Sequence, residues 1–341
     1  FIGGGFQNMN KGTHGAISGG CRNTITGACG AIGGGAVNVV AGGFGTVAGG
    51  YNNCVDSAGG YGFVGGGLLN RAFGTYTSAL GGYNNWAYGY VGTAGGGCNN
   101  QVQAVAGFIG GGICNQVCNV TNGCLAAGAV VVGGVGNNTT GGTWDLATCA
   151  FTVAPTICNA GQYSFVGGGF QNHACDCFAA ISSGCKNIAG ANSFIGSGIC
   201  NTTNATSVIG GGCLNVTTGQ YAFIGGGACS CVINGSYSAM TGGQSNIVNA
   251  NWSVIGGGLG NFVCQQRSGV FSGWSNSSVA EYSTIVGGSL NCVAGLHSFI
   301  GGGTYNTICN STSPCLSFGS VIVGGVGNNT TGGTWSLATC A

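Results

Sequence analysis

An asparagine returns along this chain about every fifteen residues, six positions after a small or apolar residue that usually opens a Gly-Gly stretch. Successive asparagines lie 14 to 17 residues apart, except for two spacings of 23 and one of 34, and Ser230 takes the asparagine's place once. A period this short and persistent is typical of a solenoid, in which each repeat forms one coil stacked on the last. The series comprises Asn8, Asn23, Asn38, Asn53, Asn70, Asn85, Asn100, Asn115, Asn138, Asn172, Asn187, Asn201, Asn215, Asn246, Asn261, Asn276, Asn291, Asn306 and Asn329.

The residues six positions before these asparagines indicate extended structure. Most are β-branched, as at Ile17, Val47 and Ile300, and β-branched residues favour strands. A coil of this length has a perimeter of only roughly 50 Å, so its corners are sharp. Glycine, which supplies 78 of the 341 residues, and asparagine best tolerate the positive φ that sharp corners need. We therefore predict an all-β fold, a parallel β-solenoid (β-roll or β-helix) with coils of about 15 residues.

Charge is scarce: charged residues make up 3% of the chain and the net charge is +1. The chain has no basic stripe, which argues against nucleic-acid binding, and no run of 18 apolar residues, which argues against membrane insertion. With so few ionised side chains, electrostatic repulsion between copies of the chain is weak and does little to prevent their association. We expect a surface covered by copies of the same chain or by sugars, hence a homo-oligomer (trimer or filament) in an extracellular, cell-surface or virion-surface location.

The sequence also contains a repeat much longer than one coil. The segment 1–8 returns almost unchanged as 165–172, and 132–144 returns as 323–335. This duplication predicts two tandem solenoid units, 1–164 and 165–341, the second incomplete at its C-terminal end. Because the sequence opens at Phe1 in the middle of a coil, we expect a mature or excised segment.

Each irregular spacing carries extra residues that two cysteines bracket. Many cysteines in a thin chain with little core favour an oxidising compartment. We predict that a disulfide closes each protruding loop, and the three predicted pairs are Cys118–Cys124, Cys309–Cys315 and Cys149–Cys158.

Other cysteines lie one or two positions before the recurrent asparagine. Equivalent residues of consecutive coils would be about 4.8 Å apart, within the Cα range of a disulfide. Pairs such as Cys98–Cys114 and Cys200–Cys213 either staple neighbouring coils or link neighbouring chains. The alternative is that they stay reduced and pack as small apolar side chains.

Asn-x-Ser/Thr sequons also recur. Those inside the bracketed inserts, Asn119 and Asn310, and those in the recurrent series, Asn138 and Asn329, are the predicted glycosylation sites. The alternative is that a repeat rich in Asn and Thr generates sequons by chance.

Catalytic groups are sparse and dispersed. The four carboxylates, Asp56, Asp145, Asp176 and Glu281, form no acid–base pair in the sequence. The three histidines are isolated, and Cys175-x-Cys177 lacks the further ligands of a structural zinc site. We predict no enzyme activity, no cofactor and no metal.

The coil Gly-x-x-Ser-x-Ile-Gly-Gly-Gly, as at Gly295 to Gly303 and in part at Gly219 to Gly227, resembles the head repeats of trimeric autotransporter adhesins. It is also similar to repeats of phage and giant-virus fibre proteins. The resemblance covers nearly the whole chain, and it implies a left-handed parallel β-roll, three chains side by side, with binding on the outer surface. The cysteines and the less regular repeats depart from the adhesin pattern and favour the fibre proteins.

These observations predict a non-enzymatic structural protein of the cell exterior or virion surface, whose solenoids assemble into fibres. The alternative is an adhesin or receptor-binding fibre that recognises host-surface glycans or receptors. An ice-binding solenoid would need threonines in one constant register, and the threonines of this chain do not keep one.

Overall fold

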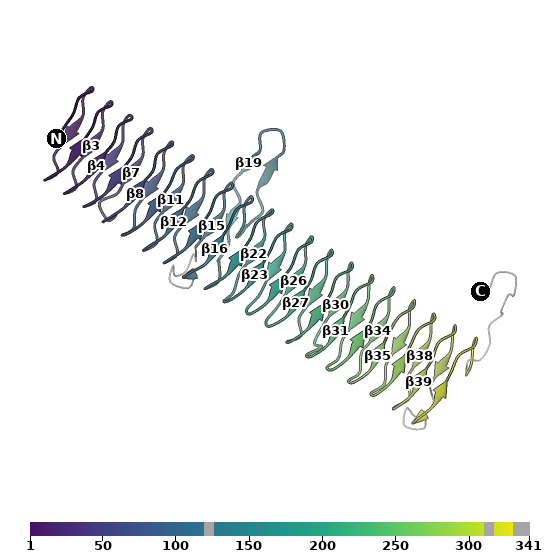
Figure 1. The fold of residues 1–341 in the computed structure, drawn as a ribbon. Coiled ribbons are helices and arrows are strands. Elements are labelled where there is room, and N and C mark those ends of the chain that lie inside the picture. The colour runs from purple at the N-terminus through teal and green to yellow at the C-terminus, as the bar shows by residue number, and fades with distance from the viewer. Residues whose placement is uncertain (119–125, 310–316, 330–341) are drawn as a thin grey trace. The chain divides into compact units, whose positions relative to one another are not determined.

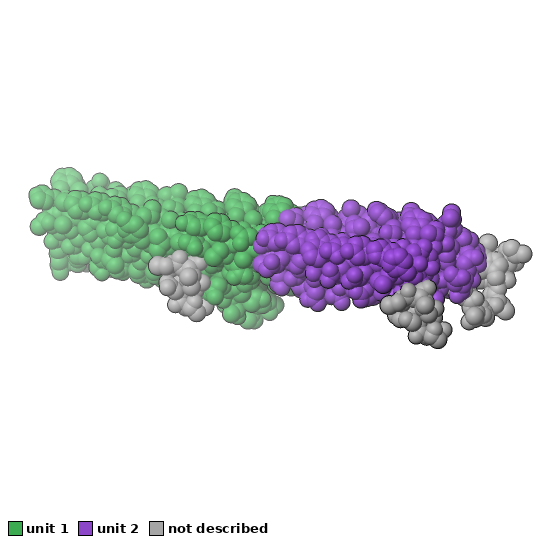
Figure 2. Space-filling view, turned by 90° about the horizontal axis from the view of Figure 1, so that it is seen from below, with its two compact units in different colours: residues 1–200 green, residues 201–341 purple. Residues whose placement is uncertain are grey.

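The computed structural model describes residues 1–118, 126–309 and 317–329. The chain divides into two compact units, Phe1–Cys200 and Asn201–Ala341, coloured separately in Figure 2. The named elements of the described residues are all strands, and nearly all have two residues. In each unit these strands stack coil upon coil in parallel ladders (Figure 1), which confirms the predicted parallel β-solenoid.

In unit 1 most coils supply one strand to each of two parallel ladders. The second ladder is interrupted between its strands β15 and β22, where a hairpin is inserted. The first ladder contains β2 (Ala16–Ile17), β4 (Ala31–Ile32), β6 (Thr46–Val47), β8 (Phe63–Val64), β10 (Ser78–Ala79), β12 (Thr93–Ala94), β14 (Phe108–Ile109), β16 (Val130–Val131), β21 (Phe165–Val166), β23 (Ala180–Ile181) and β25 (Phe194–Ile195). The strands of the other side are β1 (Met9–Asn10), β3 (Thr24–Ile25), β5 (Val39–Val40), β7 (Cys54–Val55), β9 (Arg71–Ala72), β11 (Trp86–Ala87), β13 (Gln101–Val102), β15 (Gln116–Val117), β22 (His173–Ala174) and β24 (Ile188–Ala189).

Unit 2 repeats this arrangement. Its first ladder contains β27 (Val208–Ile209), β29 (Phe223–Ile224), β31 (Ala239–Met240), β33 (Val254–Ile255), β35 (Gly269–Val270), β37 (Thr284–Ile285), β39 (Phe299–Ile300) and β41 (Val321–Ile322). The second contains β26 (Thr202–Thr203), β28 (Val216–Thr217), β30 (Cys231–Val232), β32 (Ile247–Val248), β34 (Phe262–Val263), β36 (Ser277–Ser278), β38 (Cys292–Val293) and β40 (Thr307–Ile308). A third line of contact in both units consists of isolated parallel bridges, such as Cys98↔Ile113.

The core follows from the alternation within most ladder strands: the first residue is partly or fully exposed and the second is buried, whereas β15 and β35 are buried at both residues. One column of unit 1 runs through Ile17, Ile32 and Val47, and a second runs through Ile25 and Val40, all at most 1% exposed. Successive coils are therefore held together by two aliphatic columns and by backbone hydrogen bonds between adjacent coils.

One glycine of each coil is required by the close approach of the next coil. At Gly35 the φ angle is 81°, and a Cβ there would lie 2.1 Å from the carbonyl oxygen of Gly50. No side chain fits so close to the neighbouring backbone. The prediction that the recurrent asparagine itself has a positive φ is wrong: the residue just before it has the left-handed backbone, as at Arg22 (φ 54°) and Val37 (φ 59°).

The longest spacing contains a hairpin that leaves the coils of unit 1 (Figure 1, at β19). It consists of β17 (Thr139–Thr140), β18 (Thr143–Asp145), β19 (Ala150–Val153) and β20 (Thr156–Ile157). β17 pairs antiparallel with β20 and β18 with β19. Since β16 pairs directly with β21, the ladder continues across residues 164 and 165. The duplication into 1–164 and 165–341 is a feature of the sequence and stays a prediction about domain organisation.

Candidate functional site

The recurrent asparagines form a buried column of hydrogen bonds, here called the asparagine ladder. The backbone N–H of Asn38 donates to Oδ1 of Asn23 over 3.0 Å, and its Nδ2 donates to the carbonyl oxygens of Gly34 and Gly50, both 3.0 Å away. Asn38 is fully buried. Because its polar atoms are occupied by the chain itself, the ladder has a structural role and offers no binding site.

The ladder passes through two residues that differ from the predicted series. Asn137, not Asn138, donates its N–H to Oδ1 of Asn115 over 2.9 Å. Near the C-terminal end, Asn328, not Asn329, donates in the same way to Asn306 over 3.1 Å. The two shorter inserts are therefore each one residue shorter than predicted, and the hairpin insert is one residue longer, because the N–H of Asn172 donates to Oδ1 of Asn137. Ser230 takes the predicted place, donating its N–H to Oδ1 of Asn215 over 3.1 Å.

Burial rules out one predicted glycosylation site in the folded chain. Asn138 is 1% exposed, its Nδ2 donates to the carbonyl oxygen of Gln116 over 3.0 Å, and its Oδ1 accepts the N–H of Ala174 over 3.1 Å. A sugar on this nitrogen would break that bond and find no space. Asn329 is exposed, and its glycosylation stays a prediction. Asn119 and Asn310 lie outside the described residues.

The hairpin geometry also corrects a predicted disulfide. Cys149 lies at the hairpin tip, beside the Asp145↔Ala150 pair, whereas Cys158 follows the Thr139↔Ile157 pair at its base. The strand between them is roughly 20 Å long, but the Cα atoms of a disulfide lie within about 7 Å. Both thiols are free, so the predicted Cys149–Cys158 disulfide is not formed. Cys118 and Cys309 are described as thiols, and their predicted partners Cys124 and Cys315 lie outside the described residues.

Cys158 lies instead beside two other thiols at the base of the hairpin. Burial, and after it the neighbouring Cys158, raise the pKa of Cys118 to about 11. Burial, followed by the charge of Asp176, raises the pKa of Cys175 to about 11. Thiols with such pKa values are protonated at neutral pH and are poor nucleophiles.

His173 also lies at the base of the hairpin, and burial lowers its pKa. Its Nε2 lies 2.8 Å from the carbonyl oxygen of Asn159, which accepts a hydrogen bond from the neutral ring when that nitrogen is protonated. Within the described residues, no group of three or more His, Cys, Asp or Glu side chains is arranged to hold a metal ion.

A groove of about 360 Å³ lies between the hairpin and the coils of unit 1. Cys98 and Cys114 line its coil side, and Cys149 and Phe151 line its hairpin side. Gln116 is 8% exposed at its floor, and its Oε1 has no hydrogen-bond partner among the described residues. The groove thus brings three cysteines together, which their sequence positions do not indicate.

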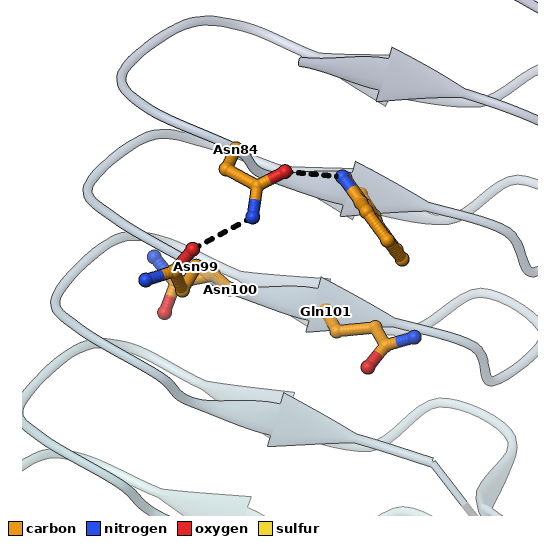
Figure 3. Close-up of a pocket in the computed structure, with 5 residues that line it drawn as sticks. Asn84, Asn99, Asn100 and Gln101 are labelled. Carbon is orange, nitrogen blue, oxygen red and sulfur yellow. Dashed lines mark hydrogen bonds between the residues drawn. The ribbon is translucent and has the colours of Figure 1, made fainter. Parts of the chain in front are cut away.

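A smaller polar hollow of about 100 Å³ lies on unit 1 (Figure 3). The indole Nε1 of Trp86 donates to Oδ1 of Asn84 over 2.8 Å, and Nδ2 of Asn84 donates to Oδ1 of Asn99 over 2.8 Å. Asn100 and Gln101 complete the lining. A volume of this size holds about three water molecules or one polar group of a ligand.

Aromatic rings at equivalent positions of successive coils stack on one another in unit 2. Tyr221 and Tyr237 are stacked at 4.8 Å between ring centroids, and Tyr282 and His297 are stacked at 4.6 Å. Arg267 fills the interval between the two groups, 5.0 Å from the Trp252 ring and 5.3 Å from the Tyr282 ring. Because these rings cover one another's faces, the faces are not available to stack on a sugar.

No protein-family model matches this chain, and no curated protein does. A search of the described residues finds no helix with the length and apolar character of a membrane span.

Proposed function

We propose that this chain is a non-enzymatic structural protein whose β-solenoid units associate with copies of themselves into fibres, outside the cell or on a virion surface. The observation that carries the proposal is the outward face of the first ladder of unit 2, here called the outer row. Its residues are Val208, Phe223, Ala239, Val254, Gly269, Thr284, Phe299 and Val321.

The outer row has no charged side chain; its members are apolar except Thr284, and Gly269 is buried and has no side chain. Phe223 is 43% exposed, Phe299 36% and Val321 63%. The residues are in register from strand to strand, as Phe223 is with Ala239, so the row forms a regular surface. Contiguous exposed apolar surface of this kind supports association, and no charged side chain in the row opposes the approach of a second copy.

The proposal is tested by measuring the mass of the assembled chain with light scattering and imaging it by electron microscopy. Replacing Phe223 and Phe299 by lysine should shift the material to monomers while circular dichroism stays unchanged. The matched control is Gln244→Lys, an exposed position on the third line of contact, which should assemble like the parent chain. A parent chain that stays monomeric, or a double variant that assembles normally, would contradict the proposal.

A fibre that binds host-surface glycans is the second candidate, and the hollow at Trp86 favours it. An indole ring, with the Arg71 guanidinium 5.7 Å from its centroid, lies beside the amides of Asn84, Asn99 and Gln101, so the hollow combines part of an aromatic surface with donors and acceptors for hydroxyl groups. Binding of the parent chain to a glycan array, lost in Trp86→Ala and retained in Trp252→Ala, would support this candidate. An array that shows no binding by the parent chain would exclude it.

A further inference from the structure

Three pairs of cysteines share one arrangement on consecutive coils, and they are here called the diagonal pairs: Cys98 with Cys114, Cys185 with Cys200, and Cys213 with Cys229. In each pair the first cysteine lies two residues before its ladder residue. The second lies one residue before the ladder residue of the next coil.

The backbone brings the two members of each pair together. The N–H of the second cysteine donates to the carbonyl oxygen of the first over 2.9 Å in all three pairs. The second cysteine has the left-handed backbone each time, with φ of 54° at Cys114 and Cys200 and 53° at Cys229. Neighbours bonded in this way across coils have Cα atoms roughly 5 to 6 Å apart, which lies inside the range of disulfides.

The side chains of two pairs also influence each other. Burial is the main cause that raises the pKa of Cys114, and the neighbouring Cys98 raises it further. Burial likewise raises the pKa of Cys185, with Cys200 as the next cause. All six cysteines are free thiols that are partly or fully exposed, so a small reagent reaches them.

We propose that the diagonal pairs are modification sites, each closing to a disulfide between consecutive coils by exchange with a low-molecular-weight disulfide such as oxidised glutathione. One cysteine, as the thiolate, attacks a glutathione sulfur and displaces one glutathione thiolate. The second cysteine thiolate attacks the protein sulfur of this mixed disulfide and displaces the other glutathione. The protein pair loses two electrons and two protons, and these appear in two molecules of reduced glutathione.

The arrangement distinguishes these pairs from other cysteines of the same rows. Cys21 occupies the first position of a would-be pair, but Val37 occupies the second, and its N–H donates to the carbonyl oxygen of Cys21 over 2.9 Å. Cys21 therefore has the backbone geometry of a diagonal pair without a second thiol, which makes it the matched control.

The test incubates the whole chain with oxidised glutathione, blocks the remaining thiols with iodoacetamide and maps the cysteines by mass spectrometry after proteolysis. The expected result is three cross-linked peptides, one for each diagonal pair, while Cys21 carries glutathione or the alkyl group. In Cys98→Ser, Cys114 should lose its cross-link and the other two pairs should keep theirs. Cys149→Ser should retain the Cys98–Cys114 link, although Cys149 lines the same groove.

Two results would overturn the proposal. One is that both cysteines of the diagonal pairs carry glutathione or alkyl groups as independent thiols. The other is that they cross-link to different partners, such as Cys98 to Cys149. The test does not depend on assembly, since a monomeric chain can form the same three bridges.

Discussion

The backbone N–H of Asn115 donates to Oδ1 of Asn100, one coil earlier and 3.0 Å away. Nδ2 of Asn100 donates to the carbonyl oxygens of Gly96 and Gly112, at 2.7 Å and 2.9 Å. One side chain thus binds its own coil and the following coil at once. Repeated from coil to coil within each unit, this arrangement stabilises a core that contains only narrow aliphatic columns.

Replacing Asn100 by alanine should destabilise unit 1 strongly. The substitution leaves one N–H and two carbonyl groups with fewer partners, and a buried polar group without a partner costs about 1–3 kcal/mol. We expect the free energy of unfolding to fall by about 3 kcal/mol or more, measured by urea denaturation. Gln101→Ala, at the adjacent outward-facing position, should change it by no more than about 0.5 kcal/mol; equal effects of the two substitutions would contradict the role of the ladder.

Ser230→Asn should stabilise unit 2. Ser230 is buried and accepts the N–H of Asn246 over 3.4 Å, but its side chain cannot reach the carbonyl groups that Nδ2 of an asparagine binds elsewhere. The side chain of an asparagine at this position would donate two hydrogen bonds to backbone carbonyl groups, as the other ladder asparagines do. Each such bond contributes about 1 kcal/mol to stability. The measurement is the urea midpoint, and a lower midpoint in Ser230→Asn would show that the site cannot hold the larger side chain.

Gly35→Ala and Gly34→Ala should differ sharply although they are neighbours. A Cβ at Gly35 would meet the Gly50 carbonyl oxygen at 2.1 Å with φ at 81°, whereas a Cβ at Gly34 meets nothing within 4 Å. We expect Gly35→Ala to lose about 3 kcal/mol or more of unfolding free energy, because the coils must separate or the backbone must change. Gly34→Ala should stay within about 1 kcal/mol of the parent chain.

Much of this fold could be predicted from the sequence, because the coil repeats its signals many times. The β-branched residues at Ile17, Ile32 and Val47 predict the buried column, and the structure confirms it. The predicted register is wrong by one residue at the first insert. The three consecutive valines and the doublet Asn137–Asn138 there are compatible with two alignments to the preceding coil. The pairing of Ile109 with Val131 and the hydrogen bond from Asn137 to Asn115 distinguish the two alignments.

The candidate sites were less predictable, because they depend on contacts between coils. The sequence marks Cys98 and Cys114 as neighbours, but only the backbone bond between them reveals a shared diagonal geometry. The hairpin position of Cys149 depends on antiparallel pairing that a run of Thr, Gly and Ala does not specify. The stack of Tyr221 on Tyr237 has a sequence signal, aromatic residues about one coil apart, which the spacing of the asparagines does not reveal.

The contribution of the aromatic stack of unit 2 to stability should depend on Arg267. Its guanidinium contacts the Trp252 and Tyr282 rings and donates to the Tyr282 hydroxyl over 2.8 Å. Each cation–π contact at an exposed site contributes about 0.5–1 kcal/mol, so Arg267→Met should lower the free energy of unfolding by about 1–2 kcal/mol. Arg22→Met, which removes a bond from Nε to Gln7 Oε1 only, should have a smaller effect in the same urea titration.

Stability should fall as the pH falls through the titration of His173. Burial lowers the pKa of this ring in the folded chain below its ordinary value of 6.5, so the unfolded chain binds the proton more readily. The resulting loss of unfolding free energy is absent above about pH 7, and it grows as the pH drops below 6.5 toward the pKa of His173 in the folded chain. His173→Gln should flatten this part of the profile of urea midpoint against pH, and an unchanged slope would assign the dependence to other groups.

The most direct test of the account is an experimental density map of unit 2 that resolves side chains. We predict that Ile209, Ile224 and Met240 are successive members of one column, with the N–H of Ser230 directed at the side chain of Asn215. A map in which these residues are not neighbours across consecutive coils would contradict it.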